Sequence, residues 1–242
     1  MSKIKQAIIT AGGLGTRLRP LTLTVPKVMI PILGKPLLQH HIEQFKKHGV
    51  GEFFFTLHYL PDVITSYFGD GAKFGVKIHY SAEEVPLGTA GGLKVFEKKL
   101  DNEFFYVYGD IFSLVDYSKM ENKFHSKSNA IGMQRVGKMG YRPDVDLADL
   151  SDDWRIVKIY PKPHSGRPDN PYSLRGISVL KKRILDFVPN AEYDMGRQLL
   201  PEIIEKGYDF YGYECDEYSQ GIDTIEKYQA VEEYLKNAEK DD

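Results

Sequence analysis

The chain has 242 residues, which suits one large α/β domain or two lobes that share a sheet. With 42% apolar residues, 27% charged residues and a net charge of −2, its composition is typical of a soluble globular protein and shows no basic face for nucleic acid. Its single cysteine, Cys215, excludes an internal disulfide, and no apolar stretch reaches the roughly 18 residues of a membrane span. We therefore expect a cytoplasmic protein that binds neither nucleic acid nor a membrane.

The first half of the sequence alternates short apolar segments with amphipathic ones. Apolar or aromatic runs predict buried strands at 7–9, 53–57, 76–80 and 104–108. Helical patterns begin between them at Pro36, Pro61 and Thr89. Strands that alternate with helices predict a largely parallel sheet covered on both faces, with ligands at the carboxyl ends of its strands.

The second half is less regular. Strand patterns occur at 130–136, 155–159, 174–180 and 208–213, and helical patterns at 193–206 and 224–236. An aspartate-rich stretch separates the first two strands, and a proline-rich loop spans 161–171. This half therefore predicts a mixture of strands and loops rather than regular strand–helix alternation.

A glycine-rich loop follows the first predicted strand. Its residues are Ala11, Gly12, Gly13, Leu14, Gly15, Thr16 and Arg17. Backbone N–H groups beside glycines, together with a guanidinium, suit a phosphate chain, and residues 1–42 contain six Lys or Arg and no Asp or Glu. The loop lacks the Gly-Lys-Ser/Thr of a P-loop, and Leu18 replaces the third glycine of a dinucleotide fingerprint. It predicts a polyanion site of another class.

The loop and the residues after it resemble a known family. The segment AGGLGTRLRPLT, with Pro26-Lys27 and Lys35-Pro36, is similar to the signature of the sugar-1-phosphate nucleotidylyltransferases. The resemblance implies a Rossmann-like three-layer α/β/α fold with a mostly parallel, mixed central sheet, in one nucleotidyltransferase domain over 1–242. About 1–113 would bind the nucleotide, about 114–222 the sugar phosphate, and 224–238 would form a C-terminal helix. The sequence has no hexapeptide repeat, so we expect no β-helix extension.

The resemblance also implies the catalytic and metal-binding residues. Arg17 would bind the departing phosphates, and Lys27 would bridge the α-phosphate and the attacking group. Asp110, in Tyr108-Gly109-Asp110 after a predicted strand, would bind Mg²⁺. Its partner would be Asp223, whose turn Gly-Ile-Asp-Thr differs from the Asp-Ile-Gly-Thr of the family. The alternative for Asp110 is a helix N-cap or turn residue, and for Asp223 an N-terminal cap on the last helix, a role that can coexist with metal binding.

On the sugar side, Lys162-Pro163 matches the family's Glu-Lys-Pro, with Pro161 in place of the glutamate. Lys162 would hold the sugar phosphate; a solvated surface lysine is the alternative. Gly176 and Asp146 would complete the pocket, but Leu174 stands where relatives commonly have Asn. The resemblance to members that act on manno-configured heptose 1-phosphates is carried by Asp146-Leu147 and the run Lys162-Pro163-His164.

On the nucleotide side, the segment Leu87 to Gly91 resembles the one that lies along the base and ribose. The nucleotide-binding residues implied are Ala11, Gly12, Gly13, Gly15, Thr16, Glu83, Glu84, Gly88 and Thr89. A carboxylate such as Glu83 or Glu84 can accept from both N1–H and N2–H of guanine, whereas thymine or uracil pairs better with an amide. GTP is therefore favoured, unless both glutamates face solvent.

The resemblance thus predicts an enzyme that transfers a nucleotidyl group from an NTP, with GTP favoured, to a manno-configured sugar 1-phosphate, with Mg²⁺ as cofactor. A phosphate monoester is largely a dianion at neutral pH, so it is a nucleophile without a catalytic Ser, Cys or His. Two alternatives stay open: thymidylyl, uridylyl or cytidylyl transfer to glucose 1-phosphate or another monoester, and a catalytically silent subunit that senses a nucleotide sugar. The sequence also leaves a homo-oligomer open.

Overall fold

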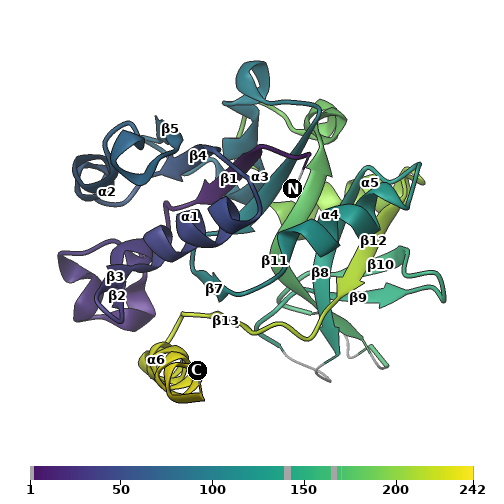
Figure 1. The fold of residues 1–242 in the computed structure, drawn as a ribbon. Coiled ribbons are helices and arrows are strands. Elements are labelled where there is room, and N and C mark those ends of the chain that lie inside the picture. The colour runs from purple at the N-terminus through teal and green to yellow at the C-terminus, as the bar shows by residue number, and fades with distance from the viewer. Residues whose placement is uncertain (1–2, 139–142, 165–167, 170, 242) are drawn as a thin grey trace.

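A nine-stranded sheet forms the centre of the computed structural model, which describes residues 3–138, 143–164, 168–169 and 171–241 (Figure 1). Its strands are β1 (Gln6–Thr10), β4 (Glu52–Leu57), β5 (Lys77–Ala82), β6 (Glu103–Tyr108), β8 (Gly132–Lys138), β9 (Leu147–Leu150), β10 (Ile156–Tyr160), β11 (Tyr172–Lys181) and β12 (Phe210–Glu214). The order is β10-β9-β11-β6-β1-β4-β5, and β8 pairs with both β11 and β12. Two short pairs lie outside it, namely β2 (Pro31–Ile32) with β3 (Lys35–Pro36) and β7 (Ile111–Ser113) with β13 (Ser219–Gly221).

The strand directions confirm the mixed, mostly parallel sheet. Strand β1 runs parallel to β4 and β6, β4 to β5, and β8 to β12. Strand β11 is antiparallel to β6, β8 and β9, and β10 is antiparallel to β9. Only β10 and β11 therefore run against the other strands of this sheet. The four parallel strands of the first half match the prediction, whereas β7, β9 and β13 were not predicted.

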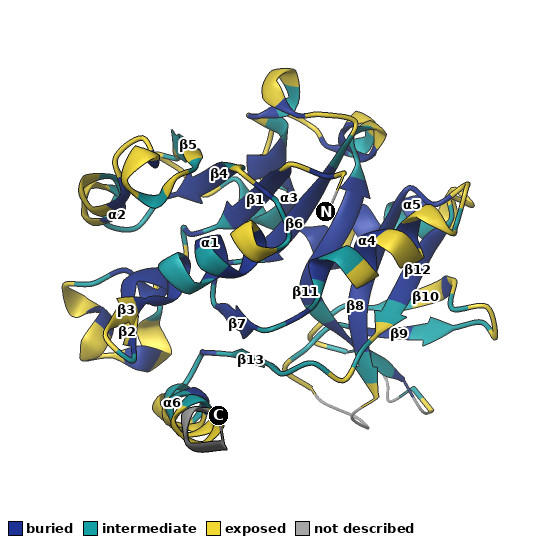
Figure 2. Cartoon of the chain, in the orientation of Figure 1, coloured by how far each residue is buried: buried dark blue, intermediate teal, exposed yellow. Residues whose placement is uncertain are grey.

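Helices cover both faces of the sheet. They are α1 (Leu37–Lys47), α2 (Pro61–Phe68), α3 (Gly88–Lys94), α4 (Tyr117–His125), α5 (Leu200–Glu205) and α6 (Ile225–Asp241). Alternate residues of β6 face opposite sides: Phe105 joins the core beneath α1, α2 and α4, whereas Phe104 joins the core beneath α3 and α5. Figure 2 shows the central strands buried and the exposed residues on the outer helices and loops. The three-layer prediction is confirmed.

Two helices differ from the predicted ranges. The one expected from Thr89 ends as an α-helix at Lys94, and a 3-10 turn follows at Glu97–Lys99. The one expected over 193–206 begins only after Asp194, which caps a π-helical segment, Met195–Leu199, that leads into α5. Helix α4 was missed, although Asp116 caps it by accepting a hydrogen bond from Lys119 N at 3.0 Å.

The C-terminal helix α6 packs against the N-terminal part of the chain, away from the main sheet (Figure 1). A third apolar cluster joins them, in which Leu18, Ile32, Phe112, Ile222 and Val231 are all buried. The tyrosines of residues 218 and 234 also stack, with ring centroids 3.8 Å apart. This packing brings the start of α6 beside the glycine-rich loop. No helix in the described ranges is long and apolar enough to cross a membrane.

Candidate functional site

Two cavities meet at the carboxyl ends of the parallel strands. The first, of about 410 Å³, is lined by Thr10, Gly12, Gly13, Gly15, Lys27, Val28, Thr56, His58, Glu83, Pro86, Gly88, Thr89, Tyr108, Asp110, Lys162 and Asp194. The second, of about 210 Å³, is lined by Arg17, Tyr108, Asp110, Ile111, Asp144, Val145, Asp146, Lys162, Ser173, Leu174, Arg175, Gly176, Ser219, Gln220, Gly221, Asp223 and Lys227. Tyr108, Asp110 and Lys162 belong to both, so the cavities are neighbouring parts of one site.

The glycine-rich loop forms one wall of the first cavity. Gly15 has φ +60, and a Cβ there would come within 2.8 Å of the Thr22 side chain, so this position requires glycine. The Thr22 hydroxyl donates to Gly15 O at 2.7 Å, and Ala11 N donates to Thr56 O at 2.8 Å. These bonds fix both ends of the loop and leave its glycine backbone along the cavity.

Lys27 and Asp110 form an ion pair where the two cavities meet. Lys27 Nζ lies 2.6 Å from Asp110 Oδ2, and the lysine side chain is only 10% exposed. Asp110 directly follows Gly109 at the end of β6, and the Gly109 carbonyl lies 3.1 Å from His41 Nε2. Burial lowers the pKa of His41 to about 4, so at neutral pH the ring is uncharged and can donate one hydrogen bond to that carbonyl. His41 thereby holds the turn that presents Asp110.

Asp223 lies beside Asp110, although the two are far apart in the sequence. Strands β7 and β13 pair Gly221 with Ile111, and Ile222 N donates to Asp110 O at 2.8 Å. The Asp223 carboxylate contacts Arg17 Nη1 at 2.9 Å and Lys227 Nζ at 2.6 Å. Burial alone would raise the pKa of Asp223, but Lys227, Arg17 and Lys27 lower it below its usual value. Asp223 is therefore a carboxylate at neutral pH.

Lys162 is held from both sides of its backbone. Its N–H donates to Asp146 Oδ1 at 2.9 Å, and its carbonyl accepts from Arg197 Nε at 3.1 Å. Asp146 also lies against Gly196, where a Cβ would come within 2.3 Å of a carboxylate oxygen. Asp146, which the family resemblance assigned to the sugar pocket, therefore also fixes the position of Lys162.

The segment that carries Glu83 and Thr89 forms the opposite wall of the first cavity. Thr89 Oγ1 donates to Asp194 Oδ2 at 2.8 Å, and Leu87 N donates to Glu83 Oε2 at 2.9 Å. Glu83 Oε1 is buried and has no hydrogen-bond partner among the described residues, and burial raises the pKa of this carboxyl group. This oxygen lies against Gly92, where a Cβ would come within 2.7 Å of it.

Most of the predicted site residues line one of the two cavities. Those in the first are Gly12, Gly13, Gly15, Lys27, Glu83, Gly88, Thr89, Asp110 and Lys162, and the second adds Arg17, Asp146, Gly176 and Asp223. Ala11, Thr16 and Glu84 line neither cavity: Ala11 is buried beneath the loop, and the other two are exposed.

Several lining residues were not predicted, among them His58, Asp194, Arg175 and Lys227. The sequence carried a signal for Lys227, since it lies one helical turn after Asp223 and follows a helix start. Asp194 fell inside a predicted helix and was therefore not recognised as a cap.

Asp110 and Asp223 fit a hard divalent cation. They are two carboxylates in the wall of one cavity, and Mg²⁺ is commonly bound by one or two carboxylates with phosphate oxygens and water. The described residues contain no cluster of three or more His, Cys, Asp or Glu that would form a metal cage. The donor set therefore suits a metal that arrives with a phosphate ligand rather than a closed structural site.

The fold and site define a class of protein: an α/β domain with a glycine-rich loop and a carboxylate pair at the carboxyl edge of the sheet. Residues 6–233 match the family model described as nucleotidyl transferase, so the chain belongs to the nucleotidyl transferase family.

Relatives in the family differ in the substrates they are named for. A UTP--glucose-1-phosphate uridylyltransferase of Synechocystis sp. is 32% identical over 226 residues, 87% of this chain and 58% of that protein. A D-glycero-alpha-D-manno-heptose 1-phosphate guanylyltransferase of Campylobacter jejuni is 44% identical over 116 residues, 48% of this chain and 52% of that protein. The chain thus spans between half and two thirds of the length of these curated relatives.

A solved structure shares the fold. The crystal structure of HddC from Yersinia pseudotuberculosis complexed with GMP-PN matches with a TM-score of 0.78 at 23% identity, and covers 96% of this chain and 100% of that chain. The likeness agrees with the layers and sheet order described above.

Proposed function

We propose that this protein transfers a nucleotidyl group from an NTP to a sugar 1-phosphate and releases pyrophosphate. The observation that carries the proposal is the meeting of the two cavities at Asp110 and Lys162. A nucleotide on the glycine-rich loop and a sugar phosphate at Lys162 would bring their phosphates to this junction. Within one domain over 1–242, we assign nucleotide binding to about 1–113, sugar-phosphate binding to about 114–222 and the C-terminal helix to 224–238.

The reaction would be one in-line displacement at the α-phosphorus. An oxygen of the sugar phosphate forms the new bond to phosphorus, and the bond to the β-phosphate breaks, so that pyrophosphate leaves with the electron pair. Since both reactants are polyanions, the work of the protein is positioning and charge neutralisation. Arg17 would bind the departing phosphates, Lys27 would bridge the α-phosphate and the attacking group, and Lys162 would hold the sugar phosphate.

Asp110 and Asp223 would hold Mg²⁺, which neutralises part of the phosphate charge when it is bound. The ion pairs Lys27–Asp110 and Arg17–Asp223 suggest how the site is prepared for this. Each pairs a carboxylate with a cation, so arrival of metal and phosphate would let the carboxylates turn to the metal and the cations to the phosphates. Without ligand, each of these two carboxylates is offset by the cation that it contacts.

GTP and a manno-configured hexose or heptose 1-phosphate are the proposed substrates. The support is Glu83, a lining residue of the first cavity whose carboxyl group can accept hydrogen bonds from a base that donates N–H groups. The name and the local 44% identity of the manno-heptose guanylyltransferase agree with this choice. Uridylyl transfer to glucose 1-phosphate is the second candidate, because the relative named for it matches over 87% of this chain.

The experiment that tests the proposal is a matrix of the four NTPs against a panel of sugar 1-phosphates with Mg²⁺, read by pyrophosphate release and by mass spectrometry of the products. We expect release that requires both substrates and is fastest with GTP and a manno-configured sugar 1-phosphate. Fastest release with UTP and glucose 1-phosphate would select the second candidate. No release with any pair would leave the nucleotide-sugar sensor as the better account.

A further inference from the structure

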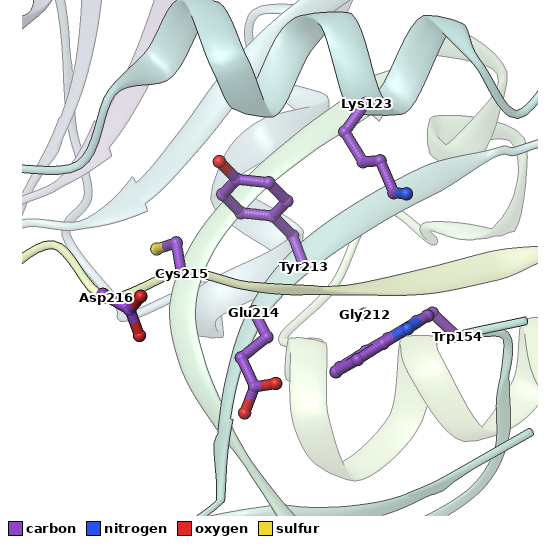
Figure 3. A pocket seen from close by; sticks show the side chains of 7 residues that line it. All are labelled: Lys123, Trp154, Gly212, Tyr213, Glu214, Cys215 and Asp216. Carbon is purple, nitrogen blue, oxygen red and sulfur yellow. The ribbon is translucent and has the colours of Figure 1, made fainter. Parts of the chain in front are cut away.

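Asp223 reaches the site on a segment that leaves the main sheet. This crossing segment, residues 215–223, begins after β12, pairs with β7 as β13, and ends at the start of α6 (Figure 1). Figure 3 shows its first residue, Cys215, beside a separate pocket, with the Cys215 and Tyr213 side chains on the opposite side of the strand from Glu214. The β7–β13 ladder has only three residues on each strand, and so short a pair is marginal by itself.

A buried arginine on β8 binds this crossing segment at several points. Arg135 is 7% exposed, and its Nε donates to Cys215 Sγ at 3.1 Å. Its Nη1 donates to Ser219 Oγ at 2.5 Å, and its Nη2 donates to Glu217 O at 2.9 Å. All three acceptors belong to the crossing segment, and the planar fork of arginine reaches them together as a lysine ammonium group cannot.

These contacts continue to the proposed metal site. Ser219, the first residue of β13, pairs with Ser113 of β7, and at the other end of the ladder Gly221 pairs with Ile111. The next residue, Ile222, donates its N–H to Asp110 O at 2.8 Å. A buried guanidinium is tolerated only where its donors are satisfied, so the position of Arg135 and the conformation of the crossing segment depend on each other.

We infer that Arg135 is a positioning residue for the reaction: it fixes the crossing segment, and thereby holds Asp223 beside Asp110. The inference rests on the proposed function, in which these two carboxylates bind Mg²⁺. Arg135 lines neither cavity, but Ser219, Gln220 and Gly221 of the crossing segment line the second one. Its loss therefore acts on the metal carboxylate and on that part of the second cavity, and leaves the wall of the first cavity in place. Loss of a residue that orients a metal ligand typically costs about 10–100-fold in metal affinity or activity.

The test compares Arg135→Gln with Arg135→Lys and with the control Arg155→Gln. Arg155 contacts the same strand β12 through its bridge to Tyr211 and pairs with Asp209 at 3.5 Å, but it lies outside the crossing segment. For Arg135→Gln we expect kcat to fall, and the Mg²⁺ concentration at half-maximal rate to rise, each by about 10-fold or more, with the KM for the NTP within about 3-fold. Arg135→Lys should be intermediate, and Arg155→Gln unchanged.

Hydrogen–deuterium exchange provides a readout that does not depend on activity. In Arg135→Gln, amides of the crossing segment should exchange faster, whereas those of β1 and β4 should not. If Arg135→Gln does not fold, Ser219→Ala removes one acceptor of the guanidinium while its contacts to Cys215 and Glu217 stay, and it should produce the same pattern at smaller size.

Unchanged exchange in the crossing segment, or faster exchange with an unchanged Mg²⁺ requirement, would overturn the inference. A wild-type protein that releases no pyrophosphate would instead overturn the proposed function, while exchange would still decide whether Arg135 orders the segment.

Discussion

The two ends of the parallel strands carry similar ion pairs with different surroundings. At the amino ends, Glu52 accepts from Gln6 Nε2 at 2.6 Å, lies 2.8 Å from His79 Nε2 and pairs with Lys77 Nζ at 3.1 Å. At the carboxyl ends, Lys27 pairs with Asp110, and Arg17 pairs with Asp223.

The two clusters of charged residues differ in what brings their members together. The sheet register sets Glu52 opposite both Gln6 and Lys77, so the amino-end cluster forms whenever the strands pair. Burial alone would raise the pKa of Glu52, but its partners lower it to about 2. The carboxyl-end partners come from separate loops and line cavities, so a ligand can replace them. We therefore expect the first group to support stability and the second to support activity.

The largest expected effect is on Lys27→Met. This variant removes the cation at the junction of the cavities, and turnover should fall about 10²–10³-fold, as for loss of an oxyanion-hole donor. The melting temperature should change little. Lys94→Met is the matched control, since Lys94 pairs with Glu97 at 2.9 Å away from both cavities. If turnover of Lys27→Met stayed within a few-fold of the wild type, the Lys27–Asp110 pair would support stability rather than activity, like the cluster around Glu52.

Asp223→Asn tests the exchange of ion-pair partners. Turnover with Mg²⁺ should fall about 10²-fold, because a metal carboxylate is lost. Binding of pyrophosphate in EDTA should instead become tighter by several-fold, because Arg17 loses its carboxylate partner. Isothermal titration calorimetry measures this, with Asp209→Asn as the control. If Asp223→Asn bound pyrophosphate more weakly than the wild type in EDTA, the proposal that Arg17 changes partner from Asp223 to phosphate would be contradicted.

Lys162→Met separates the two substrates. The KM for the sugar phosphate should rise by about 10-fold or more, and the KM for the NTP should stay within about 3-fold, because a charge-assisted contact to one substrate is removed. Lys158→Met, on β10, is the control. An equal rise in both KM values would show that Lys162 does not distinguish the substrates.

Glu52→Gln should have the smallest effect, and on stability alone. At neutral pH it should lower the free energy of unfolding by about 1 kcal/mol and leave turnover unchanged. Because the folded pKa is lowered, this contribution is complete above the ordinary value of 4.5 and is lost as the pH falls toward about 2. Urea unfolding at several pH values measures it. A difference from the wild type that grows as the pH falls would contradict the assignment.

The sequence predicted the contiguous parts of this site and missed those that tertiary pairing creates. The glycine-rich loop and the strands before it were predictable, because motif and periodicity lie within a few residues. The approach of Asp223 to Asp110 depends on the three-residue strands β7 and β13, which are too short to show a period. The expectation that Asp110 and Asp223 lie together rested on family resemblance. The β7–β13 ladder supplies the physical reason.

Other residues carry no local signal at all. Asp194 lines the first cavity and accepts a hydrogen bond from Thr89 across the fold, a contact absent from any sequence pattern. In the sequence, Arg135 looks like any charged residue in a strand, and only the structure shows its hydrogen bonds to the crossing segment. Such residues could not be predicted, since burial and partners are fixed by packing between distant elements.

The stereochemical course at the α-phosphorus distinguishes one in-line displacement from two. An NTP with a chiral α-phosphorothioate, combined with the sugar 1-phosphate that reacts fastest, gives a product whose configuration at phosphorus can be assigned. We predict inversion, because the sugar phosphate displaces pyrophosphate in one in-line step. Retention would require two displacements through a nucleotidyl-enzyme intermediate, and it would contradict a site that acts by positioning and charge alone.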